Sequence, residues 1–410
     1  MDATHSWEMI KAQLPSGWRE LATELGVFRP QLAPWNAKIK DIEQVLRLEF
    51  HRAGLESSLK GTTAQAAAAE LIDISSVALH KWECKLGPYL AQLLGTMVGA
   101  GMTFAPERWA GFEVVVVDGT TVQRPGSKGT TARVRYAMRL SDLTFLYLEA
   151  TDEHQGETLR VFDAYVGQLW IGDRGYANPP GIAAIVRQQA DVLVRYNRGT
   201  LPLYDEDDEP FDVLRHVRAL RLPDQRGEWK VWMHPSDGPA LRGRLCAVRL
   251  PDDKVEEART RLRDEYGGKV STEALEAAKW LMVFTTVSRR RLSTSRVLKL
   301  YRLRWQMELE IKRDKSIDGL DKLPNFVPAT IQTWLYIKLL LQQIGRKIVS
   351  ETVIFPPSAA YWHFLPVSSV PADDPNQAAP ADQAHGQQGL VRARARPRCP
   401  ARRIDVPAAA

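Results

Sequence analysis

The sequence predicts an α/β fold: a mixed-sheet core interrupted by a mostly β insertion and preceded by a helical region. The segments EVVVVDGT (113–120) and QLWIGDRGY (168–176) share one design, a short apolar run followed by an acid and a glycine. Such runs are typical of buried strands. Strands also alternate with a predicted helix, PGIAAIVRQQA (180–190), which is the pattern of an α/β core.

Residues 1–110 are predicted to be mainly helical. The segment DIEQVLRLEFHRAG (41–54) repeats apolar residues at helical spacing, and Gly54 is a plausible end. Thr62 or Thr63 is the predicted cap of the next helix. Short helices with tight connections are typical of a DNA-binding module, for example of helix-turn-helix type, but a purely structural subdomain fits equally well.

Residues 111–197 are predicted to form the first part of the core. Short segments rich in apolar and β-branched residues mark its strands. They lie at 113–120, 133–140, 144–151, the start of 168–176, and 191–197.

Residues 198–279 are predicted to be a mostly β insertion. Three segments have the composition of strands, VLRHVRALRL (213–222), EWKVWMH (228–234) and GRLCAVRLP (243–251). Two charged helices are expected to follow, at 255–268 and, with Ser271 as its cap, at 271–280.

Residues 280–350 are predicted to be the second part of the core. They begin with a buried strand at 280–287, and a single long helix is expected at 293–316, with another helix at 329–349. From 351 to 410 the composition shifts to Ala, Pro, Gln and Arg without periodicity. This tail is predicted to be disordered, or to be an aberrant end in which a frame change replaced a further helix.

Composition narrows the class of protein. The net charge of +6 over 410 residues permits binding to a polyanion without requiring it. We see no apolar run of about 20 residues and no signal peptide, so a cytoplasmic protein without membrane contact is expected. The three cysteines match no zinc spacing and are expected to be reduced thiols.

Two acids follow predicted strands. Asp118 directly follows the apolar run of the segment 113–120, and Asp173 directly follows the apolar run that begins at residue 168. In open α/β sheets, binding sites lie beyond the strand ends. Taken singly, an acid after a strand is more often a turn or cap residue. A third functional group is therefore needed before the two acids indicate a catalytic site.

The long predicted helix supplies that group. On a helical wheel of about 100° per residue, four polar residues share an arc of about 60°. They are Tyr301, Arg304, Glu308 and Lys315. An apolar stripe lies on the adjoining arc and can pack on the sheet, which leaves the polar arc at the sheet's edge. Glu310 lies roughly opposite Glu308, beyond this stripe, so Glu308 is the better candidate. The alternative is a solvated face with pairs of charges four residues apart.

Three carboxylates suit two Mg²⁺ ions about 3.5–4 Å apart, because Mg²⁺ prefers hard oxygen ligands. We expect Asp118, Asp173 and Glu308 to be both metal ligands and catalytic residues, with Mn²⁺ able to substitute. Arg304, whose guanidinium can bind phosphate through two hydrogen bonds, is expected to hold DNA together with Lys315.

These blocks resemble the DDE transposases of bacterial insertion sequences, in the group with a Tyr-(2)-Arg-(3)-Glu-(6)-Lys signature, the insertion-sequence four family. YRLRWQMELEIKRDKS (301–316) meets every spacing of that signature. DGTTVQRPGSKGT (118–130) resembles the block of the family's first Asp, and GDRGYA (172–177) that of its second. The resemblance covers roughly 50–350.

The resemblance implies an RNase H-like core and transposition that begins by hydrolysis at terminal inverted repeats and continues by strand transfer into target DNA. It implies double-stranded DNA as partner and a homodimer on paired ends. Tyr301, Arg304 and Lys315 would grip DNA near the cleaved end, and Arg174 is a further candidate for phosphate contact. One departure is Arg135, where relatives often carry His.

Two other functions are compatible with the sequence. The first is an RNase H-like nuclease that uses the same acids and metals but does not join DNA ends. The second is a catalytically dead transposase remnant that binds repeat DNA without nicking it. Inverted repeats on both sides of the coding region would favour a mobile element.

Overall fold

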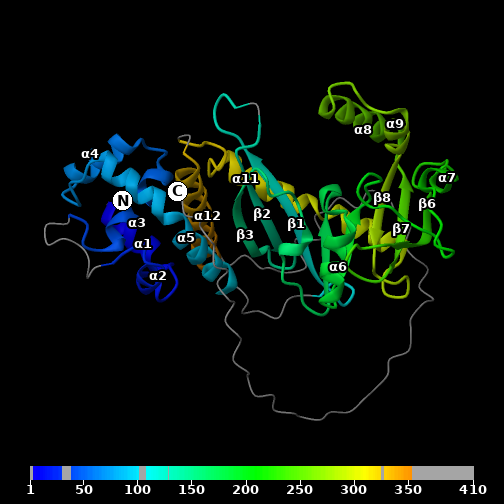
Figure 1. Ribbon diagram of the computed structural model, residues 1–410, viewed down its shortest axis with the longest axis horizontal. Coiled ribbons are helices and arrows are strands. Elements are labelled where there is room, and N and C mark those ends of the chain that lie inside the picture. Colours follow the sequence, from blue (N-terminus) through cyan, green and yellow to red (C-terminus); the bar gives the residue numbers. More distant parts are fainter. Residues whose placement is uncertain (1–2, 30–37, 101–107, 128, 325–326, 353–410) are drawn as a thin grey trace, which may run out of the picture. The chain divides into compact units, whose positions relative to one another are not determined.

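The computed structural model describes residues 3–29, 38–100, 108–127, 129–324 and 327–352 (Figure 1). The tail predicted for 351–410 lies outside the described residues from residue 353 on. Among the helices of these described segments, none has both the length and the apolar character needed to cross a membrane. The centre of the fold is an eight-stranded mixed sheet with the order β3-β2-β1-β4-β5-β8-β7-β6.

The first five strands fall where the sequence predicts strands. They are β1 (Glu113–Val122), β2 (Ala132–Arg139), β3 (Thr144–Asp152), β4 (Gln168–Gly172) and β5 (Asp191–Arg195). The strands β1, β2 and β3 are antiparallel neighbours, whereas β4 runs parallel to both β1 and β5. The helix α6 (Pro179–Arg187) connects β4 to β5, and the side chain of Asn178 caps it by accepting from the backbone N–H of Gly181 at 2.9 Å.

The remaining strands continue the same sheet. The strand β8 (Trp280–Thr285) pairs antiparallel with β5, followed by β7 (Leu241–Arg249) and then by β6 (Arg226–Met233) at the edge. The helices α7 (Val213–Val217), α8 (Asp252–Glu265) and α9 (Thr272–Ala277) interrupt this series. The segment 198–279 is therefore mixed, and the prediction that it is mostly β was wrong.

The strand predicted at 213–222 is replaced by α7. The side chain of Asp212 accepts a hydrogen bond from the backbone N–H of Arg215 at 3.1 Å and so caps the helix. Val213, Leu214 and Val217 are buried on one side of this helix. The apolar residues, which we assigned to a strand by composition, have helical spacing, and a capping aspartate precedes them.

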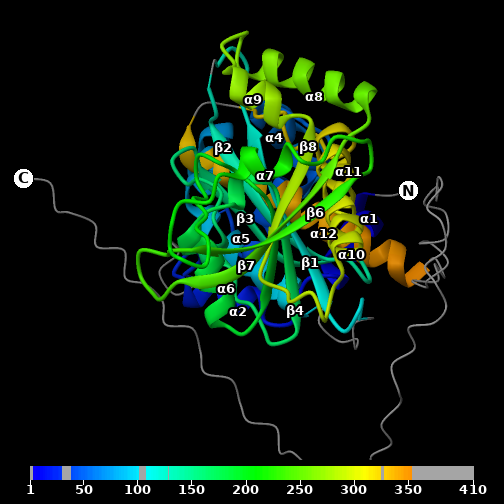
Figure 2. The same cartoon turned by 90° about the vertical axis from the view of Figure 1, so that its right-hand side faces the viewer.

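The two faces of the sheet carry different helices (Figure 2). Because side chains alternate along a strand, Val115 and Val117 lie on the face that packs against Ile182 and Ile185 of α6. Asp118 therefore lies on the opposite face, where α10 (Thr294–Arg302) packs against β5 to β8 and α11 (Trp305–Ser316) packs against β1.

The single helix predicted at 293–316 is divided into α10 and α11. At the junction, the N–H groups of Leu303 and Arg304 bond to carbonyls only three residues back, and so do those of Gln306 and Met307. This is the tighter 3₁₀ geometry. The tightened turn carries Arg304, whose guanidinium binds Asp118 across the sheet edge. Helical periodicity alone does not report such a local change.

The described N-terminal helices are α1 (Ala3–Ala12), α2 (Trp18–Glu24), α3 (Ile42–Gly54), α4 (Leu59–Ala68) and α5 (Ser76–Ala100). As predicted, α3 ends at Gly54. The prediction of Thr62 or Thr63 as the cap of α4 was wrong. Ser58 accepts from the backbone N–H of Gly61 at 3.0 Å, and both threonines are buried within the helix. The helix begins earlier than predicted because Ser58 caps it. The sequence did not indicate this start, since no apolar periodicity marks the first turn.

A buried charge cluster ties this region to the core. Arg52 of α3 forms an ion pair with Glu83 of α5 and lies 3.4 Å from Glu49. Thr333 of α12 (Pro328–Thr352) donates to the backbone carbonyl of Glu83 at 2.7 Å. One arginine thus faces two buried acids, and burial, followed by the charge of Glu83, raises the pKa of Glu49 to about 8.

The raised pKa makes stability depend on pH. The folded protein holds the proton of Glu49 more tightly than the unfolded chain does, so this contribution is complete below the ordinary glutamate pKa and disappears as pH rises towards 8. The uncharged Glu49→Gln should therefore lose less thermal stability than wild type between about pH 5 and about pH 8. The exposed Glu24→Gln serves as control. Parallel pH profiles for wild type and Glu49→Gln would contradict the assignment.

Candidate active site

Asp118 lies inside β1 rather than after it, so that part of our prediction was wrong. The strand pairs with β2 from Val115 to Val122, and Asp118 is opposite Tyr136. The parallel pairing of β1 with β4 ends earlier, at Val116. Asp118 thus stands where β1 separates from β4 while still held by β2, because the long pairing with β2 extends the strand beyond its apolar run.

Asp173 directly follows β4, as predicted. Since β1 and β4 are parallel, the positions beyond their last paired residues lie at the same edge of the sheet. The hydroxyl of Tyr301, near the end of α10, donates to Asp173 Oδ1 at 3.0 Å. This bond connects the second acid to the helix that faces it.

Arg304 stands between the acids. Its Nη1 lies 3.0 Å from Asp118 Oδ2, and its Nη2 forms an ion pair with Glu308. Only 14% of the side chains of Arg304 and Asp118 is exposed, whereas Glu308 is 45% exposed. Burial acts to lower the pKa of Arg304, but Tyr301 and Asp173, with the other two acids, raise it further above its ordinary value. The guanidinium therefore stays charged.

The pKa values of the two half-buried aspartates are shifted in opposite directions. Burial raises the pKa of Asp118 to about 6, against the opposing effects of Arg304 and the N–H of Gly119. For Asp173, burial would also raise the pKa, but Arg304 and Arg195 together with hydrogen bonds lower it below the ordinary value. The positive charge around Asp173 thus outweighs its desolvation.

Lys315 completes the predicted set. Its ammonium donates to the backbone carbonyl of Thr121 at 3.1 Å, just beyond Asp118 on β1. It also lines a surface pocket shared with Gln123 and Lys322. The structure therefore brings Tyr301, Arg304, Glu308 and Lys315 to the neighbouring ends of β1 and β4 despite the break in the helix.

Two arginines at this edge have side chains without a hydrogen-bond or ion-pair partner among the described residues. The predicted Arg174 is half-buried next to Asp173. Arg195, at the end of β5, was not predicted, although its charge lowers the pKa of Asp173. Its position directly after the apolar run at 192–194, like that of Asp118 after its own apolar run, was the signal that could have found it.

Glu157 is a further acid that the sequence analysis missed. It lies in the loop between β3 and the 3₁₀ helix η2 (Leu159–Val161). Burial, and then the charge of Asp173, raises its pKa. A single acid in a loop has no periodicity or spacing that marks it in one sequence.

Glu310, the alternative to Glu308, forms its ion pairs away from the two aspartates. It is buried, lies 2.6 Å from Arg313 and forms an ion pair with Arg346 of α12. Glu310 thus faces the helices rather than the sheet edge where Asp118 lies. This position agrees with the preference for Glu308 that the helical wheel gave.

The acids have the oxygen chemistry that divalent cations of the Mg²⁺ class prefer. A half-buried guanidinium among Asp118, Asp173 and Glu308 indicates that this place favours positive charge. Within the described segments, no three Asp, Glu, His or Cys side chains gather closely enough to hold a metal ion as they stand. The donor set therefore fits a cation, but Arg304 would have to move for a metal ion to take its place.

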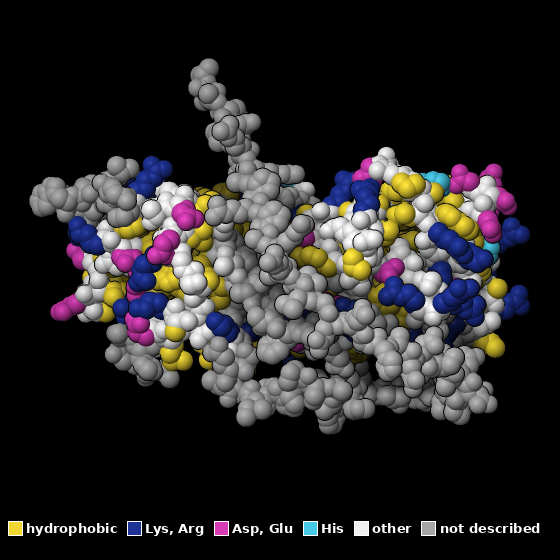
Figure 3. Space-filling view, turned by 90° about the horizontal axis from the view of Figure 1, so that it is seen from below, with side chains coloured by type: hydrophobic (Ala, Val, Ile, Leu, Met, Phe, Trp, Pro, Cys, Tyr) yellow, Lys and Arg dark blue, Asp and Glu magenta, His cyan; other side chains and the backbone are white. Residues whose placement is uncertain are grey.

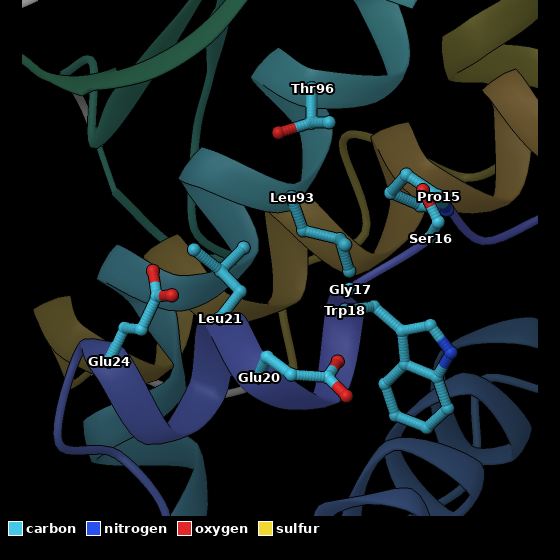
Figure 4. Close-up of a pocket in the computed structure, with 9 residues that line it drawn as sticks. All are labelled: Pro15, Ser16, Gly17, Trp18, Glu20, Leu21, Glu24, Leu93 and Thr96. Atoms are coloured by element: carbon cyan, nitrogen blue, oxygen red, sulfur yellow. The ribbon is translucent and has the colours of Figure 1, made fainter. Parts of the chain in front are cut away.

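The surface beyond the acids is unevenly charged. Lysine and arginine side chains gather over the part of the molecule formed by β6 to β8 and their loops (Figure 3). Arg226 and Lys230 of β6 and Arg242 of β7 are among the exposed cations. By contrast, the pocket between α2 and α5 is lined by residues such as Trp18, Glu20 and Leu93 and has no cationic side chain (Figure 4). The basic surface, not this pocket, suits a polyanion.

Comparison with known proteins identifies relatives over most of the chain. Residues 109–341 match the model of the family described as transposase DDE domain. The chain is 31% identical over 339 residues to the transposase for insertion sequence element IS421 of Escherichia coli, covering 79% of this chain and 89% of that protein. It is 30% identical over 338 residues to the putative transposase InsL for insertion sequence element IS186A of Escherichia coli strain K12, with the same coverage.

Removing the central cation should destabilise the protein. Arg304→Met leaves Asp118 and Glu308 without their partner, at a cost of about 1–3 kcal/mol in the free energy of unfolding. Arg302 is exposed and adjacent to Tyr301 in the sequence, and Arg302→Met should change the free energy of unfolding by less than about 0.5 kcal/mol. Urea unfolding of both variants measures the difference. Equal stabilities for the two variants would show that Arg304 does not hold the acids together.

Proposed function

Because the chain belongs to the family of transposases with a DDE domain, we propose that it cuts DNA at the terminal inverted repeats of its insertion sequence and joins the ends to target DNA. The observation that carries this proposal is the convergence of Asp118 and Glu308 on Arg304, with Asp173 held beside them by Tyr301.

The family implies both the fold of the core and the type of chemistry. A DDE transposase domain implies an RNase H-like core and metal-dependent chemistry on DNA. The strand order β3-β2-β1-β4-β5, with acids at the shared edge of β1 and β4, supports the placement of the catalytic edge. The core would continue at 280–350, and residues 1–110 remain a proposed DNA-binding region.

Asp118, Asp173 and Glu308 would hold two Mg²⁺ ions, for which Mn²⁺ could substitute. When bound, such ions supply activation of a nucleophilic oxygen and stabilisation of the leaving oxygen. The protein's own contribution is to fix the acids on rigid elements. Asp118 is held within a paired strand, Asp173 directly follows one, and Glu308 lies on α11.

The proposed reaction has two steps. In hydrolysis, water loses a proton to solvent as its oxygen bonds to phosphorus, the bond from phosphorus to the 3′ oxygen breaks, and that oxygen takes up a proton to become a 3′-hydroxyl, leaving a 5′-phosphate. In joining, this hydroxyl oxygen bonds to a target phosphorus and releases its proton to solvent, while the target's own 3′ oxygen leaves and is protonated.

The cations at the sheet edge suit the DNA backbone. Arg174, which has no ion-pair partner within the described segments, is available for a phosphate. Lys315 and Tyr301 lie on the same edge and would grip the cleaved end, together with Arg304 once it is released from the acids. A homodimer would bridge two ends of the element, and the reaction would take place on DNA in the bacterial cytoplasm.

The assignment of Glu308 can be tested by nicking. On duplex DNA with the inverted repeats that flank the coding region, Glu308→Gln should slow nicking on the order of 100-fold, about 2.7 kcal/mol of transition-state stabilisation. Glu310→Gln is the control. It loses the ion pair with Arg346 and should unfold at a lower temperature, yet nick at about the wild-type rate while folded.

Three results would change the assignment. Nicking by Glu308→Gln at the wild-type rate would remove Glu308 from the site. Nicking by wild type without joining of ends would identify a nuclease instead of a transposase. Specific binding to repeat DNA without nicking in Mg²⁺ or Mn²⁺ would identify a catalytically dead remnant.

A further inference from the structure

We propose that Glu157 is a fourth carboxylate of the metal site, contributed by the loop between β3 and η2. The proposal rests on the proposed function, because it adds a ligand to the site of Asp118, Asp173 and Glu308. It is carried by the position of the Glu157 carboxylate between the two sequence blocks that hold the aspartates.

The loop that carries Glu157 is fixed on both sides. Before it, the buried guanidinium of Arg135 donates to the backbone carbonyl of Gly156 at 2.9 Å. After it, the side chain of Thr158 accepts from the backbone N–H of Arg160 at 3.2 Å and caps η2, and Leu159 is fully buried. Glu157 is therefore held in place by its neighbours, and Arg135 has a defined positioning role.

Two glycines make room for this carboxylate. A Cβ atom added to Gly175 would lie 1.6 Å from Glu157 Oε2, and one added to Gly119 would lie 3.4 Å from Oε1. Gly119 follows Asp118, and Gly175 is two residues after Asp173. The carboxylate thus packs against the backbone beside both catalytic acids, in a space that any larger residue at position 175 would fill.

Nothing within the described segments neutralises Glu157. It has no hydrogen-bond or ion-pair partner there, although Arg133 and Arg304 are close enough to oppose the rise in its pKa. A half-buried acid without a direct partner is costly unless it binds a cation or is protonated. A site that binds two divalent cations would give Glu157 such a cation as its partner.

A second polar group points to the same space. Tyr176 is fully buried, and its hydroxyl has no hydrogen-bond partner within the described segments. That hydroxyl would lie 3.6 Å from a Cβ atom on Gly119, the same position that Glu157 approaches. Both groups interact electrostatically with Asp118. An orphaned donor and an unpaired acid, both next to Gly119, indicate a place for a ligand or a water molecule.

The balance of charges also favours a fourth carboxylate. Two Mg²⁺ ions carry four positive charges, and Asp118, Asp173 and Glu308 supply three negative ones. Glu157 would supply a fourth negative charge and so offset part of the excess positive charge, to which Arg195 also adds. Mg²⁺ also requires six oxygen ligands, so an additional carboxylate finds a coordination position.

The direct test uses Mn²⁺ alone as probe, with the full-length, DNA-free protein and the electron paramagnetic resonance signal of free Mn²⁺ as readout. Glu157→Gln keeps the size of the side chain and removes its charge. It should weaken Mn²⁺ binding about 10-fold or more, or remove one of two bound ions. Glu153→Gln, an exposed acid on the same loop, is the matched control and should bind as wild type does.

The outcomes are distinguishable. If Asp118→Asn weakens Mn²⁺ binding and Glu157→Gln does not, the fourth ligand is wrong while the proposed function stands. If neither variant weakens binding, the metal site itself is misplaced. A structural role for Glu157 would lower the unfolding temperature of Glu157→Gln and leave Mn²⁺ binding unchanged, which also overturns the proposal. Glu157→Asp, which keeps the charge on a shorter chain, should bind Mn²⁺ with an affinity between those of wild type and Glu157→Gln.

Discussion

The ion pairs of Arg304 with Asp118 and Glu308 are the constraint on which the candidate site depends. They connect a central strand to α11, and the bond from Tyr301 to Asp173 connects the neighbouring strand end to α10. Three acids near one another would repel without a cation between them. In the DNA-free protein the guanidinium is that cation. On the proposed function it has two competitors, a divalent metal for its acids and a DNA phosphate for itself.

Much of the fold follows from local patterns. The apolar runs before Asp118 and Asp173 are buried strands, and parallel pairing brings the two acids to one edge of the sheet. The cap at Ser271 is also confirmed, because its side chain accepts from the backbone N–H of Ala274. Helical angles separated Glu308 from Glu310, and the latter is buried against α12. Their chemical roles remain predictions, since burial and distance do not establish catalysis.

Several of the failures share a physical cause, because tertiary structure decided what local sequence left open. Pairing with β2 extends β1 past Asp118, and the tightened turn at Arg304 divides a helix whose periodicity is continuous. The helix α7 is different, because a local signal was missed there: Asp212 caps a helix where apolar composition suggested a strand. Glu157 and Arg195 reach the site through loop and sheet geometry, so no spacing in the sequence connects them with the acids.

The most direct test of this account is the affinity of the DNA-free protein for Mn²⁺ when Arg304 is replaced. If the guanidinium occupies the place of the metal ions, Arg304→Met should bind Mn²⁺ about 10-fold more tightly than wild type, because the metal no longer has to displace it. The exposed Arg302→Met should bind as wild type does. Unchanged or weaker binding by Arg304→Met would show that metal ions and guanidinium do not share one site, and would contradict the account.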